Sequence, residues 1–436
     1  MIFIIPAILI LLIAIIDYKN GFKLYLLYQM IWYPETQLLN IGGAWINLNF
    51  FCSTCLVILY YFKRRRVGRE SEPFPFTIPM FVIAISLFLT CLTSYSGFFS
   101  EFIKAVSLVV MDTIIVYIMW KTLNTKKDFT FLFKGITIII FIACIFIFFE
   151  KMTQLNPILD YKITCTSNGI ATYRDFIDTD VRGYRCYSIF EHSICACMVF
   201  ALYAALSINI NVKYKKYPLK KLSLVTAGLC IPAMFFTQQR AGMLLFLIGI
   251  IPVINFKKKR FWKLVIIGLI ALIAVWPLIS NNIELLFSIF STKYEKKVSG
   301  SSISMRFDQL DAIYRIMLEA PITGLGENFE RFYKGIYAAR AMGYESLWFE
   351  QMAKHGMMGV AAYLVMIFYS VYKIPKKYQS KEIFFILLSY WLTYSLTSTP
   401  YFRTYLLYGI VFFFIKSSQR YDEKTQVHNS NKRLLV

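Results

Sequence analysis

The chain lacks the short motifs that mark nucleotide hydrolysis and zinc catalysis. Its 436 residues contain no GxxxxGK[ST] loop and no HExxH pair. The first motif cradles phosphates, and the second holds a zinc ion. We therefore expect neither a metal nor another cofactor. A donor substrate that brings its own leaving group is compatible with these absences.

Acidic residues are scarce as well. With 25 Asp and Glu against 47 Lys and Arg, the net charge is +22, which in a soluble protein would favour nucleic-acid binding. Here the basic residues form short clusters between apolar runs, where the preference for positive charge on the cytoplasmic side of a membrane places them. The charge therefore predicts membrane topology and no nucleic-acid partner.

The amino end lacks the marks of a cleaved signal peptide. No basic residue precedes the apolar run from Met1 to Ile16, and no small-residue cleavage pattern follows it. We interpret this run as a first span or a signal anchor.

Long apolar runs dominate the sequence. Hydrophobic residues make up 58% of the chain, and the mean hydropathy is +0.55. Many runs approach the length of about 20 residues that crosses the hydrocarbon core. The sequence thus predicts an all-α, polytopic membrane protein with a single membrane domain over residues 1–436. The expected spans, about twelve, are 1–16, 44–62, 76–95, 101–120, 129–149, 186–210, 219–237, 240–255, 261–280, 350–372, 382–399 and 401–416.

The basic clusters predict which loops face the cytoplasm. They follow every second span, at 63–66, 121–127, 213–221, 257–263 and 373–381. Both termini are then cytoplasmic, the tail 417–436 included, and the outer face holds residues 150–185 and 281–349. The run within residues 18–43 is too short for a normal span, so we interpret it as interfacial or re-entrant. An extra span there would move only the amino end.

The outer segment 281–349, between the ninth and tenth spans, is unusually long for a membrane protein. In residues 303–319 the apolar side chains recur at helical spacing, namely Phe307, Leu310, Ile313, Tyr314 and Met317. This pattern predicts an amphipathic helix on the membrane face. Pro321 should end it, Gly324-Leu325-Gly326 should form a turn, and a second helix should begin near Tyr344.

Several arginines are expected at outer span ends, where basic residues are less common. Arg240 lies in the short polar corner 237–242, Arg182 and Arg185 precede the sixth span, and Arg306 opens the amphipathic helix. A guanidinium matches phosphate oxygens bidentately, so these arginines are candidates for binding a lipid-linked pyrophosphate. The alternative for each is an anchor that snorkels to the interface.

Glu345 is the candidate general base, because a carboxylate near a sugar hydroxyl can take its proton during attack. The alternative is a solvated acid favourable to a helix start. His192 is a secondary candidate. His355 lies ten residues beyond Glu345, roughly 15 Å along a helix, so the two cannot share one proton transfer.

Two cysteines differ from the others, which mostly lie in apolar spans. Cys165 and Cys186 fall in or beside the outer loop 150–185. We expect a disulfide between them, because this face is oxidising.

Together these features resemble the O-antigen polymerase and ligase superfamily, the Wzy-type transferases of lipid-linked glycans. The likeness covers about residues 182–363. It rests on the order of four features, which are the segment 182–192, Gln239-Arg240-Ala241-Gly242, Arg306 with the Pro-Gly turn, and the run from Glu345 to Gly359. One departure is that ligases of the superfamily usually carry a His-Asn-like pair where this chain has Glu345-Ser346.

The resemblance implies a fold of about twelve helices and a metal-independent transfer of glycan from an undecaprenyl-pyrophosphate carrier. Arg185, Arg240 and Arg306 would hold the pyrophosphate. The departure at Glu345 favours a repeat-unit polymerase of the bacterial inner membrane over a ligase that transfers finished polymer to lipid A-core or another acceptor. Whether a chain-length regulator binds the protein stays open. A flippase is disfavoured, because the polar residues gather at span ends and no internal repeat is evident.

Overall fold

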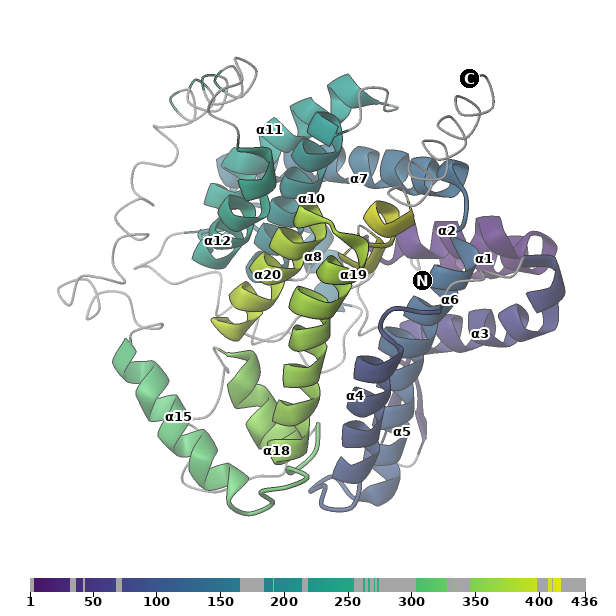
Figure 1. Ribbon diagram of the computed structural model, residues 1–436, viewed down its shortest axis with the longest axis vertical. Coiled ribbons are helices and arrows are strands. Elements are labelled where there is room, and N and C mark those ends of the chain that lie inside the picture. Colours follow the sequence, from purple (N-terminus) through teal and green to yellow (C-terminus); the bar gives the residue numbers. More distant parts are fainter. Residues whose placement is uncertain are drawn as a thin grey trace, which may run out of the picture.

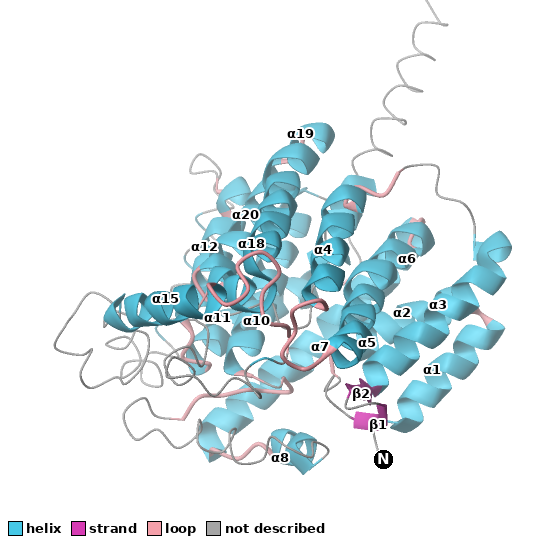
Figure 2. Cartoon of the chain, turned by 90° about the horizontal axis from the view of Figure 1, so that it is seen from below, coloured by secondary structure: helices cyan, strands magenta, loops and turns pink. Residues whose placement is uncertain are grey.

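The computed structural model shows a chain built almost entirely of helices (Figure 1). In the part of the chain that it describes, the exception is an antiparallel hairpin of β1 (Gln37–Ile41) and β2 (Ala44–Asn47), seen in Figure 2. The predicted all-α class is confirmed. The structure describes residues 4–31, 37–41, 44–67, 73–164, 184–190, 192–213, 219–254, 262, 266, 270, 273, 303–327, 329, 346–397, 407–409 and 411–416.

The described helices have well-defined bounds. In chain order they are α1 (Ile4–Ile16), α2 (Tyr18–Tyr28), α3 (Leu48–Val67), α4 (Thr77–Thr90), α5 (Phe98–Leu108), α6 (Ile115–Thr122), α7 (Lys126–Thr153), α8 (Pro157–Thr164), α10 (Ser193–Lys213), α11 (Lys220–Phe236), α12 (Arg240–Gly249), α15 (Ile303–Met317), α18 (Leu347–Phe368), α19 (Ile374–Tyr378) and α20 (Lys381–Ser395). A π-helical turn, Val109–Ile114, joins α5 to α6, and another, Tyr369–Lys373, joins α18 to α19.

Several helices are apolar enough to cross a membrane. Among the described residues, the long ones are Phe98–Thr122, Lys126–Thr153, Ser193–Lys213 and Leu347–Tyr378. Shorter apolar helices are Ile4–Ile16, Leu48–Lys63, Thr77–Thr90, Arg240–Val253 and Leu407–Lys416. Each overlaps a span expected from the sequence. The full set of about twelve stays a prediction.

Helix α10 forms the centre of the packing. Its apolar window is 89% buried, against 28–39% for the other three long helices, and it packs on α11 and α12. Small residues such as Ala201 and Ala204 let neighbouring helices approach closely. Residues next to α10 are therefore held against the most deeply buried of these long helices.

Three element boundaries differ from expectation. The expected span 44–62 begins as strand β2, because these residues pair with β1, and becomes helical only at Leu48. The sixth span was expected from residue 186, but α10 begins at Ser193. Helix α18 begins at Leu347, where the Ser346 hydroxyl accepts from the backbone N–H of Trp348 at 3.2 Å, while Tyr344 lies outside the described residues.

The amphipathic helix predicted in the outer segment is present as α15. Ile313 and Met317 are buried, whereas Phe307, Leu310 and Tyr314 are exposed. The predicted apolar face is thus divided, because α15 packs on α18 along only one side. In the view of Figure 2, α15 runs across the direction of α4 and α18.

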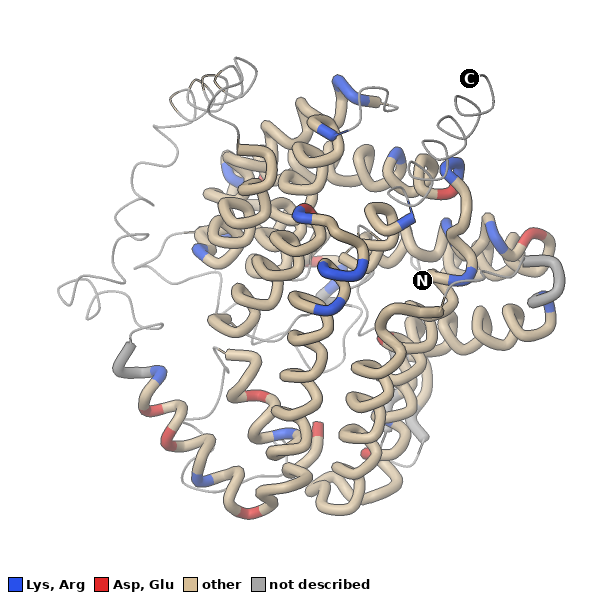
Figure 3. The backbone as a smooth tube through the Cα atoms, viewed as in Figure 1, with Lys and Arg blue, Asp and Glu red and all other residues tan. Residues whose placement is uncertain are grey.

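The charges are unevenly distributed along the molecule. In Figure 3, Lys and Arg dominate the upper half, whereas acidic residues occur among basic ones at the lower end, around α15 and the start of α18. This asymmetry agrees with the basic clusters seen in the sequence.

Candidate functional site

Two short loops meet beside the start of α10. The first, residues 184–190, precedes α10, and the second, residues 237–239, joins α11 to α12. The backbone N–H of Cys186 donates to the carbonyl of Phe236 at 3.1 Å. These contacts bring the segment that carries Arg185 against the corner that carries Arg240.

The second loop is also bonded to the first turns of α10. The side-chain amide of Gln239 donates to Ser193 Oγ at 3.0 Å, and the Cys197 thiol donates to the Gln239 carbonyl at 3.3 Å. Since Arg240 is the first residue of α12 and His192 immediately precedes Ser193, the contacts gather the two arginine-bearing segments and His192 at one end of α10.

Glu150 holds the first loop in place. Its buried carboxylate accepts from the backbone N–H of Tyr187 at 3.0 Å and of Ser188 at 2.6 Å. It also accepts from the side-chain amide of Asn156 at 2.9 Å and the Tyr184 hydroxyl at 3.1 Å. Hydrogen bonds to an ionised acceptor are the strong ones, so this cage fixes the residues on both sides of Arg185.

The backbone of both loops adopts an uncommon conformation. Ser188 has φ 55° and Gln238 has φ 54°, in the left-handed region that residues with a side chain rarely occupy. Such residues persist only where surrounding contacts over-determine them, and they gather at functional sites. The left-handed turn at Ser188 is also why the helix expected from residue 186 starts later.

Helices α10 and α12 approach so closely that position 242 requires glycine. A Cβ on Gly242 would lie 2.4 Å from Cys197 Sγ and 2.8 Å from the Cys197 carbonyl oxygen. The Ala-Gly pair after Arg240 therefore serves close helix packing, which sets where α12 begins.

His192 is built into the start of α10. Its Nδ1 accepts from the backbone N–H of Ile194 at 3.1 Å, and its ring lies edge-to-face with Tyr187 at 6.1 Å between centroids. His192 thus links the first loop to the helix.

The other predicted site residues are placed differently. Arg306 lies on α15, which packs on α18, so the described contacts do not bring it to the site beside α10. Glu345 and Arg182 lie outside the described residues.

The prediction of a disulfide at Cys186 is wrong, because Cys186 is a free, fully buried thiol. Its backbone is bonded to Phe236, which turns the residue into the core, and Cys165 lies outside the described residues. Burial raises the pKa of the Cys186 thiol, which disfavours the thiolate needed for disulfide exchange.

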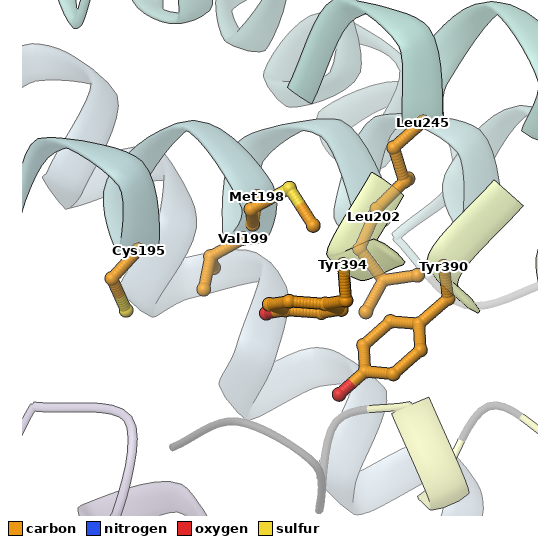
Figure 4. Close-up of a pocket in the computed structure, with 7 residues that line it drawn as sticks. All are labelled: Cys195, Met198, Val199, Leu202, Leu245, Tyr390 and Tyr394. Carbon is orange, nitrogen blue, oxygen red and sulfur yellow. The ribbon is translucent and has the colours of Figure 1, made fainter. Parts of the chain in front are cut away.

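A small apolar cleft adjoins this end of α10 (Figure 4). Leu245 of α12 lies five residues beyond Arg240, and Tyr390 and Tyr394 of α20 close the opposite side. The remaining lining comes from α10 through Cys195, Met198, Val199 and Leu202. The cleft has room for about one water molecule, and its lining residues are uncharged.

The described part of the chain contains no group of three or more His, Cys, Asp or Glu that could hold a metal ion. The chemistry of the site is instead that of guanidinium, amide and hydroxyl donors, which bind anions.

A second polar cluster lies where the outer segment meets α18. Glu327 contacts both Lys354 and His355 there. Neither Glu150 nor Glu327 stood out in the sequence as a site residue. The available signal for Glu150 was a single acid ending the apolar run 129–149, where an ionisable residue at membrane depth marks function or structure.

The helical fold and its apolar helices place this chain in the class of helical membrane proteins. Within it, residues 225–364 match the family model described as O-Antigen ligase, which agrees with the resemblance seen in the sequence. The match contains Arg240, Arg306 and Glu345, whereas Arg185 and His192 precede it. A comparison with curated proteins finds no match. The family is one of membrane enzymes of polysaccharide assembly.

Proposed function

We propose that the protein is a glycosyltransferase that polymerises undecaprenyl-pyrophosphate-linked oligosaccharide repeat units of a bacterial surface polysaccharide. The observation that carries the proposal is the meeting of the Arg185 loop with the Arg240 corner beside an apolar cleft. Guanidinium groups there can hold a pyrophosphate bidentately.

The transfer that we propose needs a base and an anion site. An acceptor sugar hydroxyl attacks the anomeric carbon of the donor, and Glu345 takes the hydroxyl proton, with His192 as the secondary candidate. The new glycosidic C–O bond forms as the bond to pyrophosphate breaks. The leaving electron pair remains on the pyrophosphate oxygen, which Arg185 and Arg240 stabilise. Arg306 and Arg182 are the further candidates for this anion, and no metal is required.

The membrane placement is also part of the proposal. We assign about twelve spans in the inner membrane, cytoplasmic termini, and residues 281–349 on the outer side, where lipid-linked repeat units are joined. The concentration of Lys and Arg at one end of the molecule in Figure 3 supports this orientation.

The second candidate function is a ligase that transfers finished polymer to lipid A-core or another acceptor. The description of the matching family favours it. Glu345-Ser346, in place of a His-Asn-like pair, favours the polymerase.

Glycan profiling of a deletion strain separates these functions. Loss of a polymerase leaves single repeat units, whereas loss of a ligase leaves long polymer on its carrier. We expect single repeats, restored to a ladder by wild-type protein but not by Arg240→Ala. Arg315→Ala is the matched control, because Arg315 is exposed and pairs with Asp311 on α15. Long carrier-bound polymer in the deletion strain would exclude the polymerase.

A further inference from the structure

Helix α18 is interrupted at Gly356, and part of the outer segment fills the interruption. The backbone at Gly356 has φ 58° and ψ −152°, which no helix contains. On one side of the break, Leu325 N–H donates to the Ala353 carbonyl and Gly326 N–H to the Lys354 carbonyl, both at 3.0 Å. Backbone groups released by the break are thus satisfied by the segment 321–326.

The other side of the break is paired in the same way. Met357 N–H donates to the Pro321 carbonyl at 2.9 Å, and Met358 N–H to the Ile322 carbonyl at 3.0 Å. The fit leaves no room for a side chain at Gly324, where a Cβ would lie 2.3 Å from the Lys354 carbonyl oxygen. The outer segment is therefore locked into α18 at this point.

Glu327 follows this locked segment and binds two successive residues of α18. Its Oε1 lies 3.1 Å from His355 Nε2, and its Oε2 lies 3.3 Å from Lys354 Nζ. Lys354 also pairs with Glu350, one turn earlier. On the far side, the backbone N–H of Glu327 donates to Glu101 Oε1 at 2.8 Å. Glu327 thus connects α18, through its carboxylate, to α5, through its backbone N–H.

His355 is hydrogen-bonded through both ring nitrogens. Its Nδ1 lies 3.0 Å from the Thr90 hydroxyl, which donates to the Ser86 carbonyl at 2.9 Å. Burial opposes ionisation of Glu327, but Lys354 and His355 hold the pKa of Glu327 well below its usual range. An ionised carboxylate only accepts, so His355 Nε2 donates a proton to it.

We propose that Glu327 is a positioning residue, whose carboxylate holds Lys354 and His355 and so fixes the outer half of α18 against α4. This inference rests on the proposed function, because the candidate base Glu345 directly precedes that half-helix. Without the carboxylate, His355 Nε2 would lose its acceptor and Lys354 would lose one of its two acidic partners, and the half-helix would shift to bring these groups to new partners.

Loss of the Glu327 contacts should affect the transfer step more than the binding of the lipid-linked donor. Arg185 and Arg240 lie beside α10, so pyrophosphate binding does not depend on the Glu327 cluster. A shift of the order of 1 Å in a reacting group can cost about 100-fold in rate. We expect Glu327→Gln to lower kcat by about that factor with little change in KM for the lipid-linked donor. Glu327→Asp, which keeps the charge, should restore part of kcat.

The test uses purified full-length protein with lipid-linked repeat units as substrate. Asp311→Asn is the matched control, because it removes an exposed carboxylate of the same outer segment. In parallel, ¹⁵N-histidine NMR reports the ring protons, and the three histidines of the chain can be assigned with His192→Gln and His428→Gln. We expect a proton on His355 Nε2, which faces the Glu327 carboxylate, in the wild-type protein.

Two results would overturn the positioning assignment. One is a wild-type spectrum in which His355 Nε2 carries no proton, which decides the matter even if Glu327→Gln does not fold. The other is an unchanged kcat in folded Glu327→Gln while the wild-type protein polymerises. A wild-type protein that makes no polymer would instead contradict the proposed function, and the spectrum would still test the cluster.

Discussion

At the scale of single residues, buried carboxylates hold loops in place by accepting backbone N–H groups. Glu150 accepts from Tyr187 and Ser188, and Glu101 accepts from Glu327. Each of these bonds joins a helix to a loop that is distant in sequence. The carboxylates therefore act as anchors for loops that carry the site.

Replacing Glu150 with Gln should release the loop that contains Arg185. The amide has one acceptor oxygen, so its NH₂ group would face a backbone N–H that Glu150 now satisfies. We expect a loss of about 2–3 kcal/mol in unfolding free energy and a strong loss of polymer. Thermal unfolding in detergent and glycan gels measure the two effects. Lys151→Gln, on the next residue, should leave both near wild type, and equal stability of the two variants would refute the anchor.

Glu327 should make the stability of the protein sensitive to acid. Because its folded-state pKa is lowered, its ionised contacts stabilise the fold above the ordinary value of about 4.3. That contribution disappears as the pH falls from there through the folded-state pKa. The difference in melting temperature between wild type and Glu327→Gln should be largest near pH 7 and shrink below about pH 4.3. A difference that stays constant down to pH 3 would contradict the ionised state.

The sequence could identify the arginines but not their anchors. Arg185 and Arg240 stand out because basic residues are unusual at outer span ends. Glu150 and Glu327 do not, since what distinguishes them is a set of partners contributed by other segments. His355 could be judged only by its distance from Glu345, whereas its actual partners are Thr90 and Glu327.

At the scale of elements, glycines allow close contacts that fix where the site helices begin and break. Gly242 lies against α10, and Gly324 and Gly356 let the outer segment enter α18. The helical pattern predicted α15 and the Pro-Gly turn, because both depend on local sequence. The break in α18 was not predictable, because it depends on hydrogen bonds from residues 321–326.

Gly242→Ala should disturb the start of α12. The added methyl group would overlap Cys197, and overpacking of this kind costs about 1–3 kcal/mol. We expect lower thermal stability and less polymer, since Arg240 would shift with the helix. Gly228→Ala in α11 is the matched control, because no atom lies within 4 Å of its new Cβ. We expect Gly228→Ala to raise the unfolding free energy by about 0.5–1 kcal/mol. Equal effects of the two substitutions would show that the contact is not tight.

At the scale of the whole molecule, the proposed function places the basic clusters and the outer segment on opposite sides of the membrane. Alkaline phosphatase is active only outside the cytoplasm, so fusions report the side directly. Fusion after Ser96 or Leu318 should be active, whereas fusion after Asn124 or Gln379 should be inactive. An active fusion after Asn124 would reverse the orientation that the basic clusters predict.

The central claim is that the arginines gathered beside α10 serve the polymerisation of pyrophosphate-linked repeat units. It is tested most directly by incubating purified protein with undecaprenyl-pyrophosphate-linked repeat units and resolving the products on a gel. We predict a ladder of increasing length from wild type and from Arg315→Ala, and no product from Arg240→Ala or Arg185→Ala that retain wild-type melting temperatures. An unchanged ladder from the folded Arg185→Ala and Arg240→Ala proteins would contradict the account.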